Sequence, residues 1–470
     1  MKISLLPFLS LPFAAAFAAL RSVGPDYARP TTAASAAYRD ATDPNAWKSV
    51  APADTAARGE WWKLFADPAL DALETRALAA NQDLQAAAAR VEEARAAAGL
   101  VRGAGRPQLV LEPSASRART SATNDIVFPQ DLTTSYNVPL VASWELDLFG
   151  RIRRQNESAR ADAAASAATF ESLRLALTAD VAENYFSLHA LDRELAAVQG
   201  SAALRQRELD LVSARLKAGA AAEFDVARAE TELADAEAES SALGVRRAAL
   251  QNALAVLVGE SAANFSLPEA PALNPLPPAV PAGLPADLLE RRPDVAAAER
   301  SLVAANARIG VAKAAFFPAI SLTGSAGYAS GDLDRLFEAD SRIWSIGPGL
   351  YLPLFQGGRN HANLERSRAA YDEAVAIYRQ RVLVAFREVQ DALTATRLLA
   401  DQSAAQDRAL AAAQRAARLA QVRYDAGYVS YLEVIDAQRT ALASERAVAL
   451  LGGQRYVTSV ALIKSLGGVW

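Results

Sequence analysis

One pattern of glycine, proline and charged residues occurs twice along this chain. Asp83, Gly99 and Pro107 return 211 positions later as Asp294, Gly310 and Pro318, and Arg215, Gly219 and Gly259 return 208 positions later as Arg423, Gly427 and Gly467. A spacing that holds over roughly 170 residues indicates an internal duplication. We therefore expect a first repeat over residues 67–259 and a second over residues 291–467.

Composition excludes several classes of protein. The net charge of −4 lacks the basic excess that a nucleic-acid partner requires. The chain has no Cys and a single Met, so it can hold no disulfide, thiolate metal site or soft thioether site. Its only histidines, His189 and His361, lie far apart in sequence and are read as ordinary polar residues. We expect no metal, no cofactor, no catalytic residue and no enzymatic activity.

The N-terminal residues are typical of an export signal. Lys2 precedes an apolar run, and Ala16-Phe17-Ala18 fits a small-x-small cleavage site. This pattern predicts a signal peptide over residues 1–18. Residues 19–66, rich in Pro, Ala and Thr with Trp47 as the main apolar anchor, are expected to form an extended arm.

Each repeat is expected to contain one β-hairpin. In the first, residues 138–148 place an apolar side chain at every second position, the period of a strand with one apolar face. The hairpins are predicted over residues 107–149 and 318–355, which gives four strands per chain.

Helical patterns fill most of the remaining sequence. Asp67-Pro68 is a suitable start for a helix running to about residue 103, because Asp caps helices and Pro fits the first turn. The stretches without proline predict two helices of roughly 100 Å, over residues 151–218 and 359–426. Return helices are expected over 223–258 and 431–466. The Pro-rich residues 260–290 are expected to link the repeats as a strap.

The predicted hairpins suggest a membrane protein that must oligomerise. Two hairpins cannot close a barrel alone, and open strand edges are not tolerated in lipid. Trp144 and Trp344, near strand ends, are expected to form a membrane belt. A soluble hairpin domain on a helical stalk is the alternative.

Several short motifs together resemble one known family. These are Val23-Gly24-Pro25-Asp26-Tyr27, Trp61-Trp62, Phe65-x-Asp67-Pro68-x-Leu70, Asn81-x-Asp83-Leu84, Leu146-Asp147-Leu148-Phe149-Gly150, Arg291-Arg292-Pro293-Asp294-Val295, Phe316-Phe317-Pro318 and Leu352-Pro353-Leu354-Phe355-Gln356-Gly357-Gly358. The chain resembles the outer membrane factors of tripartite efflux pumps, the TolC-like channels, and within them the OprM-like branch that serves RND pumps. The resemblance covers nearly the whole mature chain.

The resemblance implies an architecture and a role. The fold class is an α+β membrane protein: a homotrimer with a twelve-stranded barrel in outer-membrane lipid, continuous with a coiled-coil α-helical tunnel in the periplasm. The implied function is a passive exit duct for drugs or other small toxic compounds, working with a periplasmic adaptor and an inner-membrane RND pump. The motif differs at one point: OprM-like proteins usually carry an acylated Cys where this chain has Arg21, so lipid attachment there is impossible.

The turns between the long and return helices are the candidate functional site. Glu433 and Asp436, three residues apart, share one side of a helix; in a trimer they would form two carboxylate rings like the family's tip constriction. Asp225 with Arg228 is a candidate inter-helix contact that holds the tip closed. The resemblance adds Arg423 and Tyr424 to the gate. Helix capping by these acids is the alternative.

The same turns are expected to dock the adaptor. The candidate contacts are Lys217, Gly219, Asp425 and Gly427. Two other functions remain open: a type I secretion channel of the outer membrane, and a coiled-coil surface or stalk protein that conducts nothing.

Overall fold

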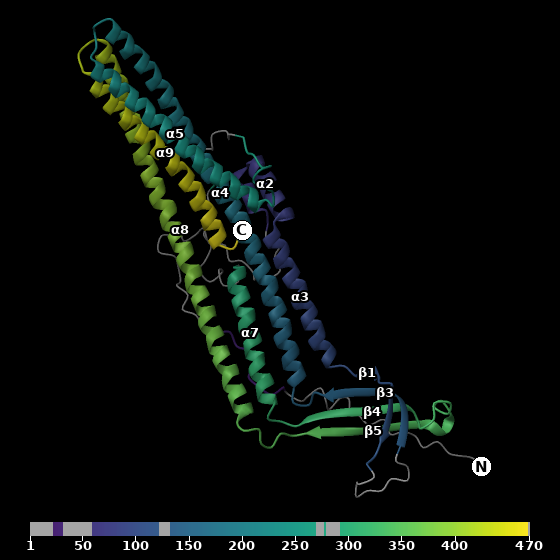
Figure 1. Cartoon of the computed structure of the whole chain (residues 1–470). Helices are drawn as coiled ribbons and strands as arrows, with labels where there is room; N and C mark the ends of the chain where they lie inside the picture. Colours follow the sequence, from purple (N-terminus) through teal and green to yellow (C-terminus); the bar gives the residue numbers. More distant parts are fainter. Residues whose placement is uncertain (1–21, 32–58, 122–131, 269–276, 279–291, 469–470) are drawn as a thin grey trace. The chain divides into compact units, whose positions relative to one another are not determined.

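The computed structural model of the chain describes residues 22–31, 59–121, 132–268, 277–278 and 292–468 (Figure 1). The chain forms two compact units. The sheet unit contains residues 1–31, 90–167 and 297–379, and the helical unit contains residues 32–89, 168–296 and 380–470. The predicted signal peptide, Arg21, Trp47 and much of the predicted linker lie outside the described residues.

The sheet unit is built on antiparallel strands. They are β1 (Gln108–Leu111), β2 (Ser114–Arg119), β3 (Leu132–Leu146), β4 (Ala319–Ser330) and β5 (Arg342–Tyr351), with the short η3 (Ala339–Ser341) before β5. The order is β1-β3-β4-β5, and β2 also pairs with β3. Strands β3 and β4, which come from different repeats, are therefore neighbours.

The first arm of the first hairpin differs from the prediction. Among the described residues there are five strands rather than four, because β1 and β2 are separated at Glu112 and Pro113. Pro113 has no N–H to donate to the ladder, while the N–H of Glu112 still donates to the carbonyl of Pro139 at 3.0 Å. Both pieces pair with β3, so they occupy one strand position.

The helices of the two repeats match in length. Helices α4 (Arg151–Lys217) and α8 (Arg359–Asp425) have 67 residues each, and α5 (Glu223–Leu257) and α9 (Tyr431–Ser465) have 35 each. These bounds confirm the predicted helices to within one residue. Each long helix ends where a glycine adopts a left-handed conformation that other residues avoid: φ is 73° at Gly219 and 76° at Gly427.

The helix predicted from Asp67 is divided in the structure. Asp67 caps α2 (Pro68–Ala80) as expected, its Oδ1 accepting from the N–H groups of Ala69 and Leu70. The chain leaves helical geometry at Asn81 and α3 (Gln82–Ala104) follows. The Asn81 Oδ1 accepts from the Leu84 N–H at 2.9 Å, so this side chain starts a new helix instead of extending the old one.

At equivalent positions in the two repeats, a side chain donates a hydrogen bond to the last carbonyl of the return helix. Asn81 Nδ2 donates to the carbonyl of Leu257, the last residue of α5, at 3.0 Å. At the matching place before α7 (Pro293–Ala314), Arg292 Nη1 donates to the carbonyl of Ser465, the last residue of α9, at 3.2 Å. Arg292 also binds Glu388 at 2.6 Å. Both side chains satisfy a helix C-terminal carbonyl that would otherwise lack a partner.

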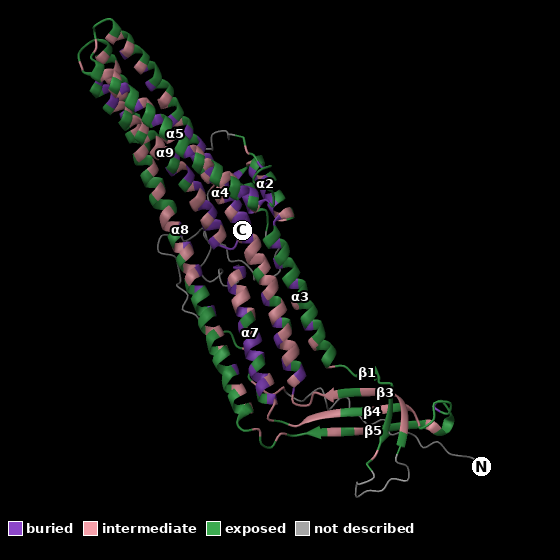
Figure 2. Cartoon of the chain, in the orientation of Figure 1, coloured by how far each residue is buried: buried purple, intermediate pink, exposed green. Residues whose placement is uncertain are grey.

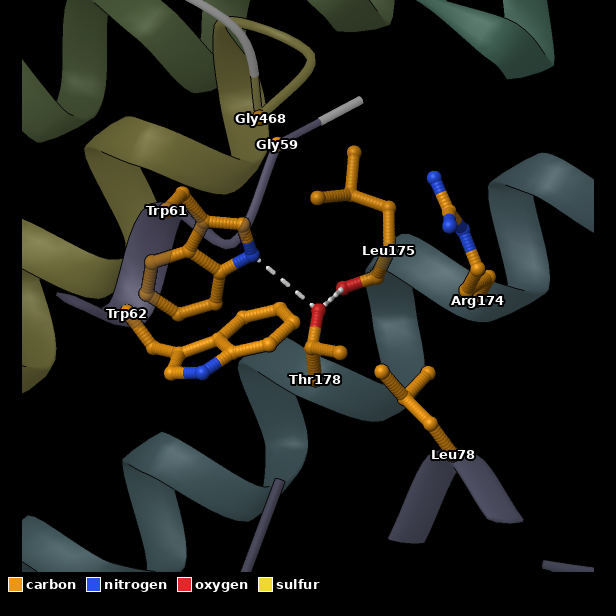
Figure 3. Close-up of a pocket in the computed structure, with 8 residues that line it drawn as sticks. All are labelled: Gly59, Trp61, Trp62, Leu78, Arg174, Leu175, Thr178 and Gly468. Carbon is orange, nitrogen blue, oxygen red and sulfur yellow. Dashed lines mark hydrogen bonds between the residues drawn. The ribbon is translucent and has the colours of Figure 1, made fainter. Parts of the chain in front are cut away.

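The core of the helical unit lies around η1 (Trp61–Phe65). Trp61 and Trp62 are about 5% exposed, and their rings meet edge to face at 5.9 Å. The Trp61 indole N–H donates to Thr178 Oγ1 at 3.1 Å, and that hydroxyl donates to the Leu175 carbonyl (Figure 3). These contacts fix the described end of the arm on α4.

None of the helices in the described ranges is long and apolar enough to cross a membrane.

A carboxylic acid is buried within this core. Glu74 of α2 is fully buried, between core residues Leu73 and Ala77, and neither of its oxygens has a hydrogen-bond partner in the described structure. Burial, reinforced by Asp71, raises the pKa of Glu74 to about 9. The side chain is therefore neutral in the folded protein at pH 7.

We expect Glu74→Leu to stabilise the protein, and to do so more at pH 8 than at pH 5. The folded state keeps a proton that the unfolded state releases above pH 4.5, so wild-type stability falls by about 1.4 kcal/mol per pH unit up to the folded pKa. Thermal unfolding at the two pH values measures the difference. Glu93→Leu, at an exposed site on α3, is the control; an equal gain for Glu74→Leu at both pH values contradicts the assignment.

Candidate functional site

The sheet has one apolar face. Trp144 pairs with Leu322, and Trp344 pairs with Ala326. Paired residues share a face, and alternate residues of β4 also share a face, so both tryptophans lie on the same side. That side also carries Leu109, Leu111, Val138, Leu140, Ile320, Ile346 and Leu350. Much of it is exposed in one chain: the exposed fraction is 77% for Trp344 and 69% for Ile346. Figure 2 colours most of β5 as exposed. An exposed apolar face of this extent is a lipid or protein contact surface.

The opposite face carries mainly hydroxyl groups and glycine. Ser143, Thr323, Ser325 and Ser345 lie on it. The hydroxyls of Ser325 and Ser345 are 2.8 Å apart, and Thr323 Oγ1 donates to the Gly347 carbonyl. The sheet therefore has one apolar face and one polar face, as the alternating pattern predicted.

The two tryptophans are not at equivalent places along the strands. Trp144 lies two residues before the end of β3, and Trp344 lies two residues after the start of β5. Strands β3 and β5 run in the same direction because both are antiparallel to β4. Their partners on β4 are four residues apart, roughly 13 Å along the strand. Trp144 is fixed at the junction of sheet and helices, where its indole N–H donates to the Gly105 carbonyl at 3.1 Å.

Both edges of the sheet are open in the described chain. Strand β5 pairs only with β4, while β1 and β2 pair only with β3. Each edge therefore presents backbone donors and acceptors without strand partners.

The two turns at the ends of the long helices have the same construction. The N–H of Ala220 donates to the Arg215 carbonyl at 2.8 Å, and that of Tyr428 donates to the Arg423 carbonyl at 2.9 Å. Lys217 and Asp425, the expected docking residues beside Gly219 and Gly427, are exposed. Asp425 accepts a hydrogen bond from Gln421 of its own helix.

The expected gate residues fall into two groups. Glu433 lies 3.9 Å from Arg423, which links α9 to α8, and Asp436 is exposed one turn further along α9. Tyr424 contacts the Tyr431 ring at 5.6 Å between centroids, and the Arg215 guanidinium lies 4.9 Å from its ring centre. Tyr424 therefore joins α8 to α9 and α4.

Asp225 and Arg228 make contacts within their own helix. The Asp225 Oδ2 accepts from the N–H of Ala222, and the Arg228 guanidinium lies 6.0 Å from the Phe224 ring centre. The structure of one chain therefore supports helix capping for Asp225, the alternative to an inter-helix contact.

Three buried carboxylates on α4 and α5 bind α9. We call them, with their α9 partners, the carboxylate ladder. Glu208 accepts from the Tyr431 hydroxyl at 3.2 Å and from Gln438; Glu232 accepts from Arg439 at 3.0 Å and pairs with Arg205 at 3.3 Å; Glu194 accepts from Arg446 at 2.8 Å. The three carboxylates are at most 9% exposed, so their charges are strongly coupled to these partners.

Sequence analysis missed this ladder. The partners Tyr431, Gln438, Arg439 and Arg446 follow a seven-residue spacing that places them on one face of α9. That periodicity was the available signal. Which carboxylates they meet depends on helix packing, which the spacing does not specify.

The two histidines take part in ring packing. His189 lies 4.3 Å from the Tyr185 ring between centroids, and His361 lies 5.0 Å from Phe316. Among the described residues no group of three or more acidic or histidine side chains could hold a metal ion.

Comparison with known proteins gives consistent matches. The family model described as "Outer membrane efflux protein" matches residues 73–260 and 284–468. The solvent efflux pump outer membrane protein SrpC of Pseudomonas putida is 39% identical over 87% of both chains. The cation efflux system protein CusC of Escherichia coli O6:H1 is 34% identical over 99% of both chains. The open-state MtrE outer membrane channel of Neisseria gonorrhoeae superposes with a TM-score of 0.83 at 31% identity, covering 95% of this chain and 98% of that one.

We expect Glu232→Ala to increase local opening of α5 and α9 in the turns around Glu232. Removing this buried carboxylate leaves Arg205 and Arg439 without their acid, a change that costs about 3–5 kcal/mol. Hydrogen–deuterium exchange of peptides from α5 and α9 should accelerate. Glu230→Ala, two residues away and exposed, should leave exchange unchanged; similar exchange in both variants would falsify the ladder.

Proposed function

The chain belongs to the outer membrane efflux protein family, and on that premise we propose that it is the passive exit duct of a tripartite efflux system. It is a protein of the outer membrane with a periplasmic helical domain. The observation that carries the proposal is the amphipathic sheet with two open edges, joined in sequence to two pairs of long helices. A sheet of this kind is stable in lipid only when its edges are paired.

The proposed assembly is a homotrimer. The β5 edge of each copy would pair with the β1 and β2 edge of the next, so that four strand positions in each of three copies make a twelve-stranded barrel. The exposed apolar face would contact lipid and the hydroxyl-lined face would contact water. The repeats, 67–259 and 291–467, would each supply one hairpin and one helix pair.

The cargo and partners follow from the family. Relatives are named for solvent efflux and for cation efflux, which indicates that the outer-membrane duct imposes little selection. We propose small toxic organic compounds as cargo, an RND-type pump as the energy source and an adaptor docking at the turns that contain Lys217, Gly219, Asp425 and Gly427. Co-purification with an RND adaptor supports this reading, whereas co-purification with a secretion ABC transporter supports a type I secretion channel.

The proposed gate lies beside the turns that contain Gly219 and Gly427, where the adaptor would dock. Glu433 and Asp436 would form two carboxylate rings in the trimer, with Arg423 and Tyr424 holding α8 beside α9. The carboxylate ladder would keep α9 on α4 and α5 in the closed state. Asp225 and Arg228 would support the turn through their own helix.

The duct itself is tested by mass measurement in detergent and by conductance in planar bilayers. We expect a trimer and discrete ion-conducting channels. A protein that is monomeric, or that shows no conductance after insertion, would be a stalk rather than a duct.

The gate is tested by Glu433→Gln combined with Asp436→Asn. Removing six carboxylates from a trimer lowers the repulsion and the cation affinity at the constriction. We expect higher conductance at neutral pH and weaker block by multivalent cations. Glu445→Gln, exposed on the same helix, is the control; currents equal to wild type in the double variant refute the gate.

A further inference from the structure

A recess of about 650 Å³ lies among α3, α4, α7 and α8 of the sheet unit. Its volume falls in the range of sites for drug-sized molecules. Four helices contribute to its walls, which carry alanine and valine side chains and an equal number of polar or charged ones. It is separate from the helix tips and from the two faces of the sheet.

The recess and the N-terminal arm occupy opposite faces of α7. On one face, Asn306 Nδ2 donates to the Pro25 carbonyl at 3.0 Å, and Gly310 lies so close to Gly24 that a Cβ there would be 2.5 Å from the Gly310 Cα. Ala305, Arg308 and Ala312 line the recess from the other face, about half a helical turn away. The N-terminal arm therefore covers the face of α7 away from the recess, and in the proposed trimer we place the recess on the lumen side.

The recess contains more positively than negatively charged side chains. Asp162 is neutralised by Arg308, with an N–O distance of 2.6 Å. Arg366, also on the recess wall, donates to the amide oxygen of Asn363 at 3.0 Å. No carboxylate of the described residues lies within ion-pair distance of Arg366. The recess therefore combines alanine and valine side chains with one guanidinium that has no carboxylate partner among the described residues, and a guanidinium readily binds carboxylates and sulfonates.

We propose that this recess is a binding site for amphiphilic organic anions on their way through the duct. The apolar body of the molecule would contact the alanine and valine side chains of the recess, and its acidic group would bind Arg366. The inference rests on the proposed function, because it places the recess on the wall of a lumen. Occupation by an anion of this size would narrow the conducting path.

The test is current block in planar bilayers by two matched probes. The anion 1-anilinonaphthalene-8-sulfonate and its uncharged analogue N-phenyl-1-naphthylamine share one aromatic body. Either is added on the extracellular side, where the tip gate does not restrict access to the lumen. We expect concentration-dependent block by the anion and much weaker block by the analogue.

Two variants locate the site. Arg366→Gln should raise the half-blocking concentration of the anion about tenfold, the factor expected for losing one charge-assisted contact. Arg368→Gln removes an exposed charge from the same helix outside the recess and should have no effect. Ala370→Phe, at an exposed position on the recess wall, should remove block by filling the space.

The outcomes separate the two proposals. Channels that conduct normally but show no block, equal block by both probes, or equal effects of Arg366→Gln and Arg368→Gln overturn the recess assignment and leave the duct intact. A protein that conducts no ions overturns the duct itself.

Discussion

Backbone hydrogen bonding at the sheet edges is the constraint on which the architecture depends. Side chains can adapt to lipid by being apolar, but the N–H and C=O groups of an edge strand cannot. In this chain β5 and the β1–β2 arm each have one unpaired side. Within the described residues, the fold of a single chain leaves both edges open. In the proposed barrel, strands of sister copies would pair with both edges.

The helical unit meets a different requirement, since its charged groups must be paired or exposed. The carboxylate ladder places buried acids on α4 and α5 and gives each a cation or hydroxyl from α9. Buried ionic groups of this kind contribute less to net stability than to a defined arrangement of helices. In contrast, Glu433 and Asp436 remain exposed in one chain, which is compatible with the proposed gate.

The features predicted well from sequence depend on neighbours in the chain. Helix length follows from the absence of proline and from Gly219 and Gly427, and the Asp67 cap follows from local hydrogen bonding. The features missed depend on partners that are distant in sequence. Asn81 ends α2 partly because its amide binds Leu257 on another helix. The division of the strand at Pro113 is different, because proline is a local signal that the sequence offered. Glu74 lies in an apolar stripe of α2, which predicts its burial. Nothing in the sequence shows that its carboxyl group lacks a hydrogen-bond partner in the described structure.

The two repeats of the sequence have joints at equivalent positions with different chemistry. The joint at Asn81 is a neutral amide on a carbonyl, whereas the joint at Arg292 adds ion pairs with Asp294 and Glu388. Dissolved salt weakens ionic contacts and hardly affects an amide hydrogen bond. Rising ionic strength therefore acts more on the joint at Arg292 than on the joint at Asn81, so two equivalent positions differ in how they respond to the surrounding medium.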